Sequence, residues 1–183
     1  ADVQLWRARC GALLTGSGTA LADDPMLTVR LPAPTEAVPP VRVVLDSSGR
    51  LPPTLKLFDG SAPTIAVHAV DVVPGYEDGT QAFALPRDGE RLDLRALLAQ
   101  LAGREINEVQ VEAGATLAGA FVAQGLVDEL LLYVAPVMLG ERARPLFEGL
   151  HIDAMTERLK MRVVETRRIG EDIRVLLQPE PGQ

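Results

Sequence analysis

Two apolar runs that flank a glycine turn give the clearest pattern along the chain. Residues 105–111 (EINEVQV) become more apolar toward their end, which predicts a strand that enters a sheet. Residues 130–135 (LLLYVA) are apolar without alternation, which predicts a strand buried on both faces. Between them, Gly114 permits a turn, Thr116 can cap a helix, and Gly125 can end that helix. This stretch therefore predicts a strand, a turn, a short helix and a second strand.

The same periodicities predict the remaining elements. Leucines at helical spacing within residues 92–104 indicate a helix with one buried stripe. Residues 160–166 and 172–177 alternate between apolar and polar positions, as an antiparallel hairpin with one solvated face does. A helix is expected over residues 1–9. Short strands are expected at 10–15, 41–45, 64–70 and 83–85. This order predicts an α/β fold with a mostly parallel sheet, helices on both faces and an antiparallel hairpin at one edge.

The turn at Gly114 has two interpretations. A strand, a glycine turn and a helix start direct backbone N–H groups and the positive end of a helix dipole at one point, which suits a phosphate. However, only Gly114 and Gly119 are present, so the Gly-x-Gly-x-x-Gly dinucleotide fingerprint is missing. The other interpretation is a tight connection in which the small residues Ala118, Gly119 and Ala120 allow close packing. The residues alone leave both open.

Two polar segments follow predicted helix or strand ends. Pro25 disfavours helical geometry at Asp24, so a helix begun at Thr19 should end there, with Asp23 and Asp24 at a turn. Residues 46–50 (DSSGR) follow a predicted buried strand, where α/β proteins bind ligands. For residues 46–50 a plain turn is an equally compatible interpretation, and for Asp23 and Asp24 taken by themselves a turn whose side chains bond their own backbone is the favoured one.

Composition excludes several classes of function. The 183 residues suit one domain, and 47% apolar with 23% charged residues is ordinary for a globular protein. A net charge of −7 without a basic run argues against nucleic acids and anionic membranes as partners. One cysteine (Cys10) and two distant histidines (His68 and His151) make a metal site unexpected. With no apolar stretch of membrane-spanning length and no signal peptide, we expect a soluble, cytoplasmic protein.

Three stretches carry a resemblance to a known family. They are GSGTALADDPMLTVR (16–30), VRVVLDSSGRLP (41–52) and VEAGATLAGAFVAQGLVDELLLYVAPVMLG (111–140). Together they resemble the reductase domain of the bifunctional riboflavin-biosynthesis deaminase/reductase, which has a dihydrofolate-reductase-like fold. The likeness extends from the first residue to about Leu177. The pairing of LADDP-x-LTVR with VE-[AG]-G-x-TLAG is specific to this family.

The resemblance implies an activity and a site. The family uses NADPH to reduce the ribose of 5-amino-6-(5-phosphoribosylamino)uracil to ribitol. Its substrate-binding positions match Arg7, Leu27, Arg30 and Glu112, and the two arginines are expected to hold the 5′-phosphate. Its cofactor-binding positions match Thr19, Asp23, Ser47, Gly114, Ala115, Thr116, Leu117, Ala118, Gly119 and Ala120.

Further roles are hypotheses built on that resemblance. Asp23 and Glu112 are expected at one sheet edge, where one carboxylate orients the ribose hydroxyls and the other assists ring opening or proton relay. Glu112 is also readily explained as a carboxylate stabilised by a helix start. Preference for NADPH over NADH is expected to depend on Ser47, Ser48 or Arg50 near the 2′-phosphate.

The chain also departs from the family pattern. A preceding strand with a serine–leucine–aspartate–glycine motif and a lysine is missing, as is the zinc-binding deaminase half. We therefore expect residues 1–183 to be a single reductase domain excised from a longer protein with a deaminase domain upstream. The apolar region 130–138 and family habit suggest a homodimer. The alternatives are a reductase of the same fold acting on a pterin or a diaminopyrimidine nucleotide, and a non-catalytic nucleotide-binding or assembly domain.

Overall fold

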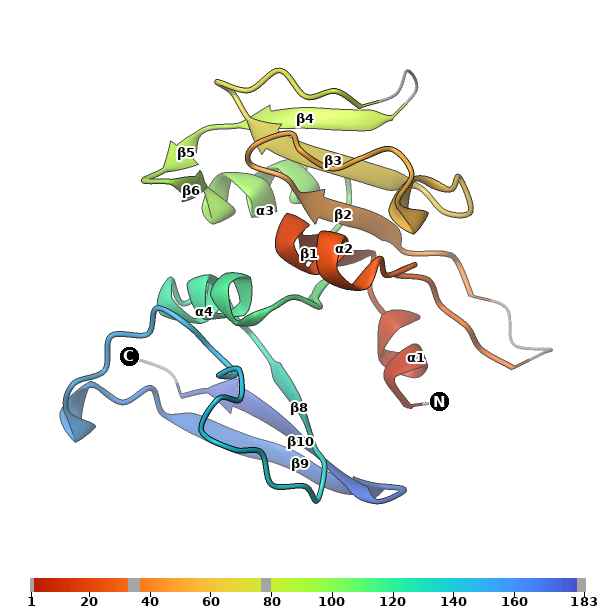
Figure 1. Ribbon diagram of the computed structural model, residues 1–183. Helices are drawn as coiled ribbons and strands as arrows, with labels where there is room; N and C mark the ends of the chain where they lie inside the picture. The colour runs from red at the N-terminus through yellow and green to blue at the C-terminus, as the bar shows by residue number, and fades with distance from the viewer. Residues whose placement is uncertain (1, 33–36, 77–79, 181–183) are drawn as a thin grey trace. The chain divides into compact units, whose positions relative to one another are not determined.

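The computed structural model describes residues 2–32, 37–76 and 80–180 (Figure 1). The chain divides into two compact units, Ala1–Leu117 and Ala118–Gln183. Helix α4 (Ala115–Ala123) runs across the boundary between them in the sequence. Each unit is described separately, and the expected single domain stays a prediction.

The first unit is built on a five-stranded parallel sheet with the order β4-β3-β2-β1-β7. Its members are β1 (Ala12–Gly16), β2 (Val41–Leu45), β3 (Thr64–Ala69), β4 (Gln81–Leu85) and β7 (Val109–Val111). The predicted strands at 10–15, 41–45, 64–70 and 83–85 are therefore confirmed. The strand expected over 105–111 is shorter, because residues 103–106 turn back onto helix α3: the Ile106 N–H bonds the Leu101 carbonyl, and Glu105 has a left-handed φ of 62°.

Helices cover both faces of this sheet. Helix α2 (Ser17–Asp23) contributes Ala20 to a core cluster on one face. The other members of that cluster are Leu13, Leu27, Val44, Leu51, Leu57 and Ala66. Helix α3 (Leu94–Ala102) buries Leu94, Leu97 and Leu101, which confirms the predicted stripe, and the Asp93 carboxylate caps it by accepting the Ala96 N–H at 3.0 Å. Just beyond α3, the Arg104 guanidinium lies 4.5 Å from the Phe83 ring centroid, on the sheet face opposite Ala66.

Short elements complete the first unit. Helix α1 (Asp2–Arg7) confirms the predicted N-terminal helix. A 3₁₀ turn, η1 (Lys56–Phe58), follows β2, and a two-stranded ribbon of β5 (Arg87–Asp88) and β6 (Arg91–Leu92) follows β4. Figure 1 shows these short elements around the parallel sheet.

The second unit contains a three-stranded antiparallel sheet with the order β8-β10-β9. It comprises β8 (Leu130–Val134), β9 (Met161–Ile169) and β10 (Asp172–Pro179), with a short 3₁₀ turn η2 (Met155–Glu157) before β9. The predicted C-terminal antiparallel hairpin is confirmed, but it pairs with β8 in a separate sheet and not at an edge of the parallel sheet. The expectation that 130–135 is buried on both faces is wrong: β8 is an edge strand of this sheet, and Val134 is 51% exposed.

Candidate active site

Three segments that carry predicted site residues lie at the carboxyl edge of the parallel sheet in the first unit. Strand β1 runs directly into α2, β2 ends at the loop 46–50, and β7 ends just before Glu112. Because the strands are parallel, their carboxyl ends lie at the same edge, where open α/β sheets bind ligands. The topology thus brings together three segments that the sequence analysis had singled out separately.

A direct contact joins two of the predicted cofactor residues. The Gly114 N–H donates a hydrogen bond to Thr19 Oγ1 at 3.1 Å, which links the β7–α4 turn to α2. Helix α4 begins at Ala115, so Thr116 lies in its first turn and is not the cap that we predicted. The first turn of an α-helix leaves N–H groups without acceptors inside the helix. These N–H groups, together with the neighbouring Thr19 hydroxyl, form a set of donors that fits a phosphate.

The small residues in the second half of that run serve close packing. A Cβ atom added to Gly119 would lie 2.0 Å from the carbonyl oxygen of Glu148, so no side chain fits there. Gly119 and Ala120 are both buried. The close-packing interpretation therefore holds for Gly119, whereas cofactor contacts of Ala118, Gly119 and Ala120 stay predictions. Gly125 adopts a φ of 64° after α4, which confirms its predicted role as the helix terminator.

Arg7 and Glu112 form a two-pronged ion pair. Arg7 Nε lies 2.7 Å from Glu112 Oε1, and Arg7 Nη2 lies 2.5 Å from Glu112 Oε2. The Gln110 side-chain amide also donates to Glu112 Oε1, at 2.7 Å. The side chains are 13% and 24% exposed, so both charges are partly desolvated and the pair has the strong, oriented geometry of a guanidinium–carboxylate fork. Glu112 is thus held in one orientation, and a phosphate-binding role for Arg7 stays a prediction.

The predicted substrate segment 27–30 is held next to this pair. Arg7 Nη1 donates to the Thr28 carbonyl at 3.0 Å, and the Arg30 N–H donates to Gln4 Oε1 at 2.6 Å. Leu27 is 3% exposed, belongs to the core cluster, and has an unusual left-handed φ of 44°. The Arg30 residue is exposed and, with Thr28, lines a surface cavity of about 480 Å³. The structure therefore groups Arg7, Glu112 and residues 27–30, with the Leu27 side chain in the core.

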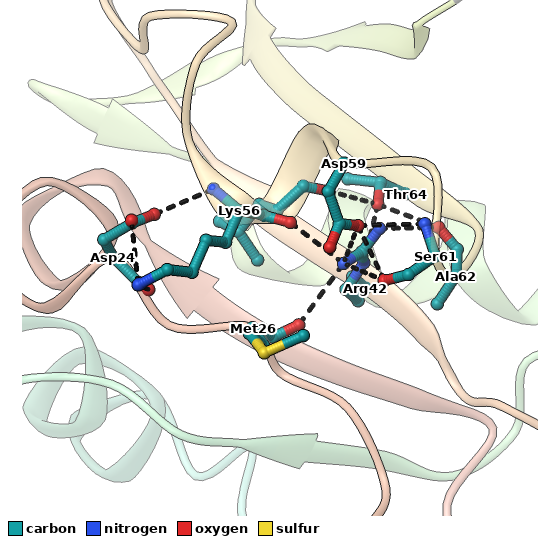
Figure 2. A network of polar contacts seen from close by, with 9 residues as sticks. Asp24, Met26, Arg42, Lys56, Asp59, Ser61, Ala62 and Thr64 are labelled. Atoms are coloured by element: carbon teal, nitrogen blue, oxygen red, sulfur yellow. Dashed lines mark hydrogen bonds and ion pairs between the residues drawn. The ribbon is translucent and has the colours of Figure 1, made fainter.

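The two adjacent aspartates have different environments. Asp23 is exposed at the last position of α2. Asp24 has a left-handed φ of 42°, which confirms that the helix ends before Pro25. Its carboxylate accepts the Lys56 N–H at 2.8 Å and pairs with Lys56 Nζ at 3.2 Å (Figure 2). These contacts, the backbone hydrogen bond foremost, lower the pKa of Asp24, so this residue clamps the η1 turn, and Asp23 is the aspartate open to a ligand.

Sequence reasoning missed a buried arginine at the centre of the first unit. Arg42 has a side chain only 1% exposed, and Figure 2 shows its guanidinium surrounded by oxygen acceptors. It donates to Thr64 Oγ1 at 2.8 Å, the Ala62 carbonyl at 2.7 Å and Asp59 Oδ1 at 3.0 Å. The signal in the sequence was a single arginine within an otherwise apolar strand (VRVVL). Hydrogen bonds from Ser61 and then from Arg42 lower the pKa of Asp59 to about 2.

The loop after β2 has a second unpredicted anchor. Asp46 is fully buried, and its Oδ2 accepts both the Leu51 N–H and the Tyr76 hydroxyl at 3.0 Å. Burial, and then the Asp46 carboxylate, raise the pKa of Tyr76. Ser47, the predicted cofactor residue, follows directly and is partly exposed, while Ser48 and Arg50 are exposed. The loop is therefore fixed at its base and open at its tip.

The fold and this edge define an α/β domain of the dihydrofolate-reductase-like type. The chain belongs to the RibD C-terminal domain family, whose model matches residues 1–175. It is 37% identical to the Escherichia coli riboflavin biosynthesis protein RibD, over 94% of this chain and 50% of that protein. The chain thus spans about half the length of the first curated relatives it matches.

Two shorter relatives match over most of their length. One is the 2,5-diamino-6-ribosylamino-4(3H)-pyrimidinone 5′-phosphate reductase of Methanothermobacter thermautotrophicus, 36% identical over 91% of this chain and 79% of that protein. The other is the 5-amino-6-(5-phosphoribosylamino)uracil reductase of Buchnera aphidicola, 31% identical over 98% of this chain and 91% of that protein.

Solved structures agree with this assignment. Acinetobacter baumannii RibD superposes with a TM-score of 0.86 at 34% identity, over 98% of this chain and 49% of that one. A diaminohydroxyphosphoribosylaminopyrimidine deaminase/5-amino-6-(5-phosphoribosylamino)uracil reductase from Thermotoga maritima gives 0.83 at 26% identity, over 97% and 48%.

Two further observations apply to the residues that the structure describes. None of the helices among them is both long and apolar enough to span a membrane. Nor do residues 2–32, 37–76 and 80–180 contain a group of three or more His, Cys, Asp or Glu side chains arranged to hold a metal ion.

Proposed function

We propose that this domain reduces the ribose of 5-amino-6-(5-phosphoribosylamino)uracil to ribitol, with NADPH as the reductant. One observation carries the proposal: a phosphate-type donor set and an oriented carboxylate stand two residues apart at the end of β7. The donor set is the first turn of α4 together with the hydroxyl of Thr19, which accepts the Gly114 N–H, and the carboxylate is Glu112 in the Arg7 fork. A dinucleotide and a phosphorylated sugar need this combination side by side.

The cofactor would be held by the carboxyl edge of the sheet. Thr19, Ser47, Gly114 and the first turn of α4 would hold its phosphates and ribose, and the exposed Ser48 and Arg50 would contact the 2′-phosphate. When bound, NADPH supplies a hydride; the protein supplies placement and polarity. The preference for NADPH over NADH is part of this proposal.

The substrate ribose would lie against the two carboxylates. Both oxygens of Glu112 already accept hydrogen bonds from Arg7, and Gln110 shares one of them, so this side chain is fixed and suits the role of orienting ribose hydroxyls. Asp23 is exposed and free to turn toward the sugar, so we assign to it the proton relay that accompanies ring opening and reduction. The exposed Arg30 would hold the 5′-phosphate.

A second candidate substrate is 2,5-diamino-6-ribosylamino-4(3H)-pyrimidinone 5′-phosphate. The names of the Methanothermobacter relative and of an Archaeoglobus fulgidus relative, 33% identical over 92% of this chain, support it. The two compounds share the phosphorylated sugar and differ in the pyrimidine. Side-by-side assays of NADPH oxidation with both compounds distinguish them.

The decisive experiment measures NADPH oxidation by the chain, together with three variants. Asp23→Asn should lower kcat by about 100-fold, the usual size of a lost acid–base contribution, with NADPH affinity retained. Glu112→Gln loses the charge of the fork and should also lower kcat. Glu108→Gln, an exposed carboxylate on the segment entering β7, should behave as wild type. If NADPH binds but neither pyrimidine oxidises it, the domain is a non-catalytic nucleotide-binding module and the proposal is wrong.

Association and cellular context complete the proposal. We propose that the protein is a homodimer, works in the cytoplasm, and carries a deaminase domain upstream of this single reductase domain. The exposed apolar side chains of Val137, Met138 and Leu139 in the second unit support association, and the name of the Thermotoga relative supports the fused deaminase. Sedimentation velocity of the wild type and of a Met138→Lys variant tests the dimer, which the added charge should weaken.

A further inference from the structure

The loop that follows β2 is closed onto itself at its base. The Asp46 carbonyl accepts the Gly49 N–H, and the Asp46 carboxylate accepts the Leu51 N–H, both at 3.0 Å. Gly49 has a φ of 62°, and a Cβ there would lie 2.9 Å from Val72 Cγ1. The two ends of the loop are therefore fixed by contacts of their own. These contacts do not fix the orientation of the peptide plane between Ser47 and Ser48.

Arg87 supplies that missing restraint from another part of the chain. Its Nη2 donates to the Ser47 carbonyl at 3.2 Å, and its Nη1 donates to the Glu90 carbonyl at 3.1 Å. Its Nε lies 3.0 and 3.2 Å from the two carboxylate oxygens of Asp71. Arg87 thus ties the loop after β2 to the segment after β3 and to its own β5–β6 ribbon.

A planar trans peptide gives this contact a directional consequence. The carbonyl of one residue and the N–H of the next point in opposite directions. Because the Ser47 oxygen is directed at the Arg87 guanidinium, the Ser48 N–H points away from it, and Ser48 is an exposed residue. That N–H is a suitable donor for an anionic group placed over the loop.

We propose that Arg87 is a positioning residue for cofactor selectivity: it fixes the Ser47–Ser48 peptide so that the Ser48 N–H faces the 2′-phosphate of NADPH. This inference rests on the cofactor site proposed above. Arg87 acts through the peptide because its own charge is offset by Asp71, whose pKa the Arg87 hydrogen bond lowers. A direct ion pair between Arg87 and the phosphate is the competing explanation.

The test compares binding of NADPH and NADH by titration calorimetry. Arg87→Met keeps the apolar stem of the side chain and removes the donors, so it should weaken NADPH binding by about tenfold, the equivalent of one charge-assisted hydrogen bond. NADH binding should change by less than about twofold, because NADH lacks the 2′-phosphate. Arg91→Met, on the neighbouring strand β6, is the matched control and should leave both affinities unchanged.

Two further variants separate positioning from direct charge. Arg87→Lys keeps the charge but lacks the planar fork that reaches acceptors on three residues, so it should resemble Arg87→Met. Asp71→Ala frees Arg87 from its partner: positioning predicts weaker NADPH binding, whereas a direct ion pair predicts stronger binding. Full NADPH affinity in Arg87→Lys, stronger binding in Asp71→Ala, or an equal loss for both cofactors would overturn the inference. Wild-type protein that binds neither cofactor would instead refute the proposed cofactor site itself.

Discussion

Replacing the buried Arg42 with methionine should destabilise the first unit strongly. The methionine side chain fills most of the volume of the arginine stem but removes every guanidinium hydrogen bond. Three of those bonds are 3.0 Å or shorter, to Thr64, Ala62 and Asp59. Without them, the Ala62 carbonyl and the Asp59 carboxylate must be satisfied in some other way.

The magnitude follows from these contacts. Breaking a buried ion pair by removing one partner costs about 3–5 kcal/mol. Asp59 is 32% exposed and can recover water, and Thr64 still donates to the Leu57 carbonyl, which favours the lower end of that range. We therefore expect a loss of about 3 kcal/mol in the free energy of unfolding, a large part of the roughly 5–15 kcal/mol of a typical domain. The corresponding fall in Tm is about 6–12 °C.

The measurement is urea unfolding followed by the fluorescence of Trp6, the only tryptophan in the sequence. Trp6 lies in the first unit, so the signal reports on the unit that contains Arg42. Arg91→Met removes an exposed arginine and is the matched control, with an expected change below about 0.5 kcal/mol. If Arg42→Met loses no more stability than this control, the network in Figure 2 does not hold the first unit together.

Three further predictions follow from single contacts. Asp59→Asn should flatten the acid dependence of stability: hydrogen bonds led by those from Ser61 lower the pKa from 3.8 to about 2, so the wild type loses stability as pH falls through that window. Tyr76→Phe removes the hydroxyl donor to Asp46 and should cost about 1–2 kcal/mol. Because the pKa of Tyr76 is raised above 10.0, the wild type should also lose stability as pH rises beyond 10.0, and the variant should lose less. Gly119→Ala puts a Cβ 2.0 Å from a backbone oxygen of the second unit and should cost about 1–3 kcal/mol.

Each of these has a control and a contrary outcome. Urea midpoints at several pH values test Asp59→Asn and Tyr76→Phe. If the stability of both variants depends on pH as that of the wild type does, the assigned titrations are wrong. Gly140→Ala is the control for Gly119→Ala, because a Cβ at Gly140 meets nothing within 4 Å. Circular dichroism during thermal unfolding compares the two glycine variants. Equal stability of the two would show that the loop at Glu148 yields without cost.

Much of the fold could be predicted from the sequence because periodicity reports burial along one element. The leucine spacing between residues 94 and 101 predicted the α3 stripe, and short apolar runs predicted the strands of the parallel sheet. Pro25 fixed the end of α2 through local sterics. The α/β order predicts parallel strands, whose carboxyl ends lie at one edge of the sheet. The segments expected to lie near the candidate site could therefore be predicted as well.

Only the tertiary structure decided which side chains meet. Arg7 and Glu112 are 105 positions apart, and nothing local in either segment indicates that they pair. Arg42 stands in an apolar strand, but its burial depends on acceptors outside that strand, most of them within residues 59–64. Strand β8 is apolar enough for a covered parallel sheet, yet it pairs antiparallel with β10 at a sheet edge. The sequence determined the burial and local geometry of each element, whereas the partner of each charged group depends on how distant elements come together in three dimensions.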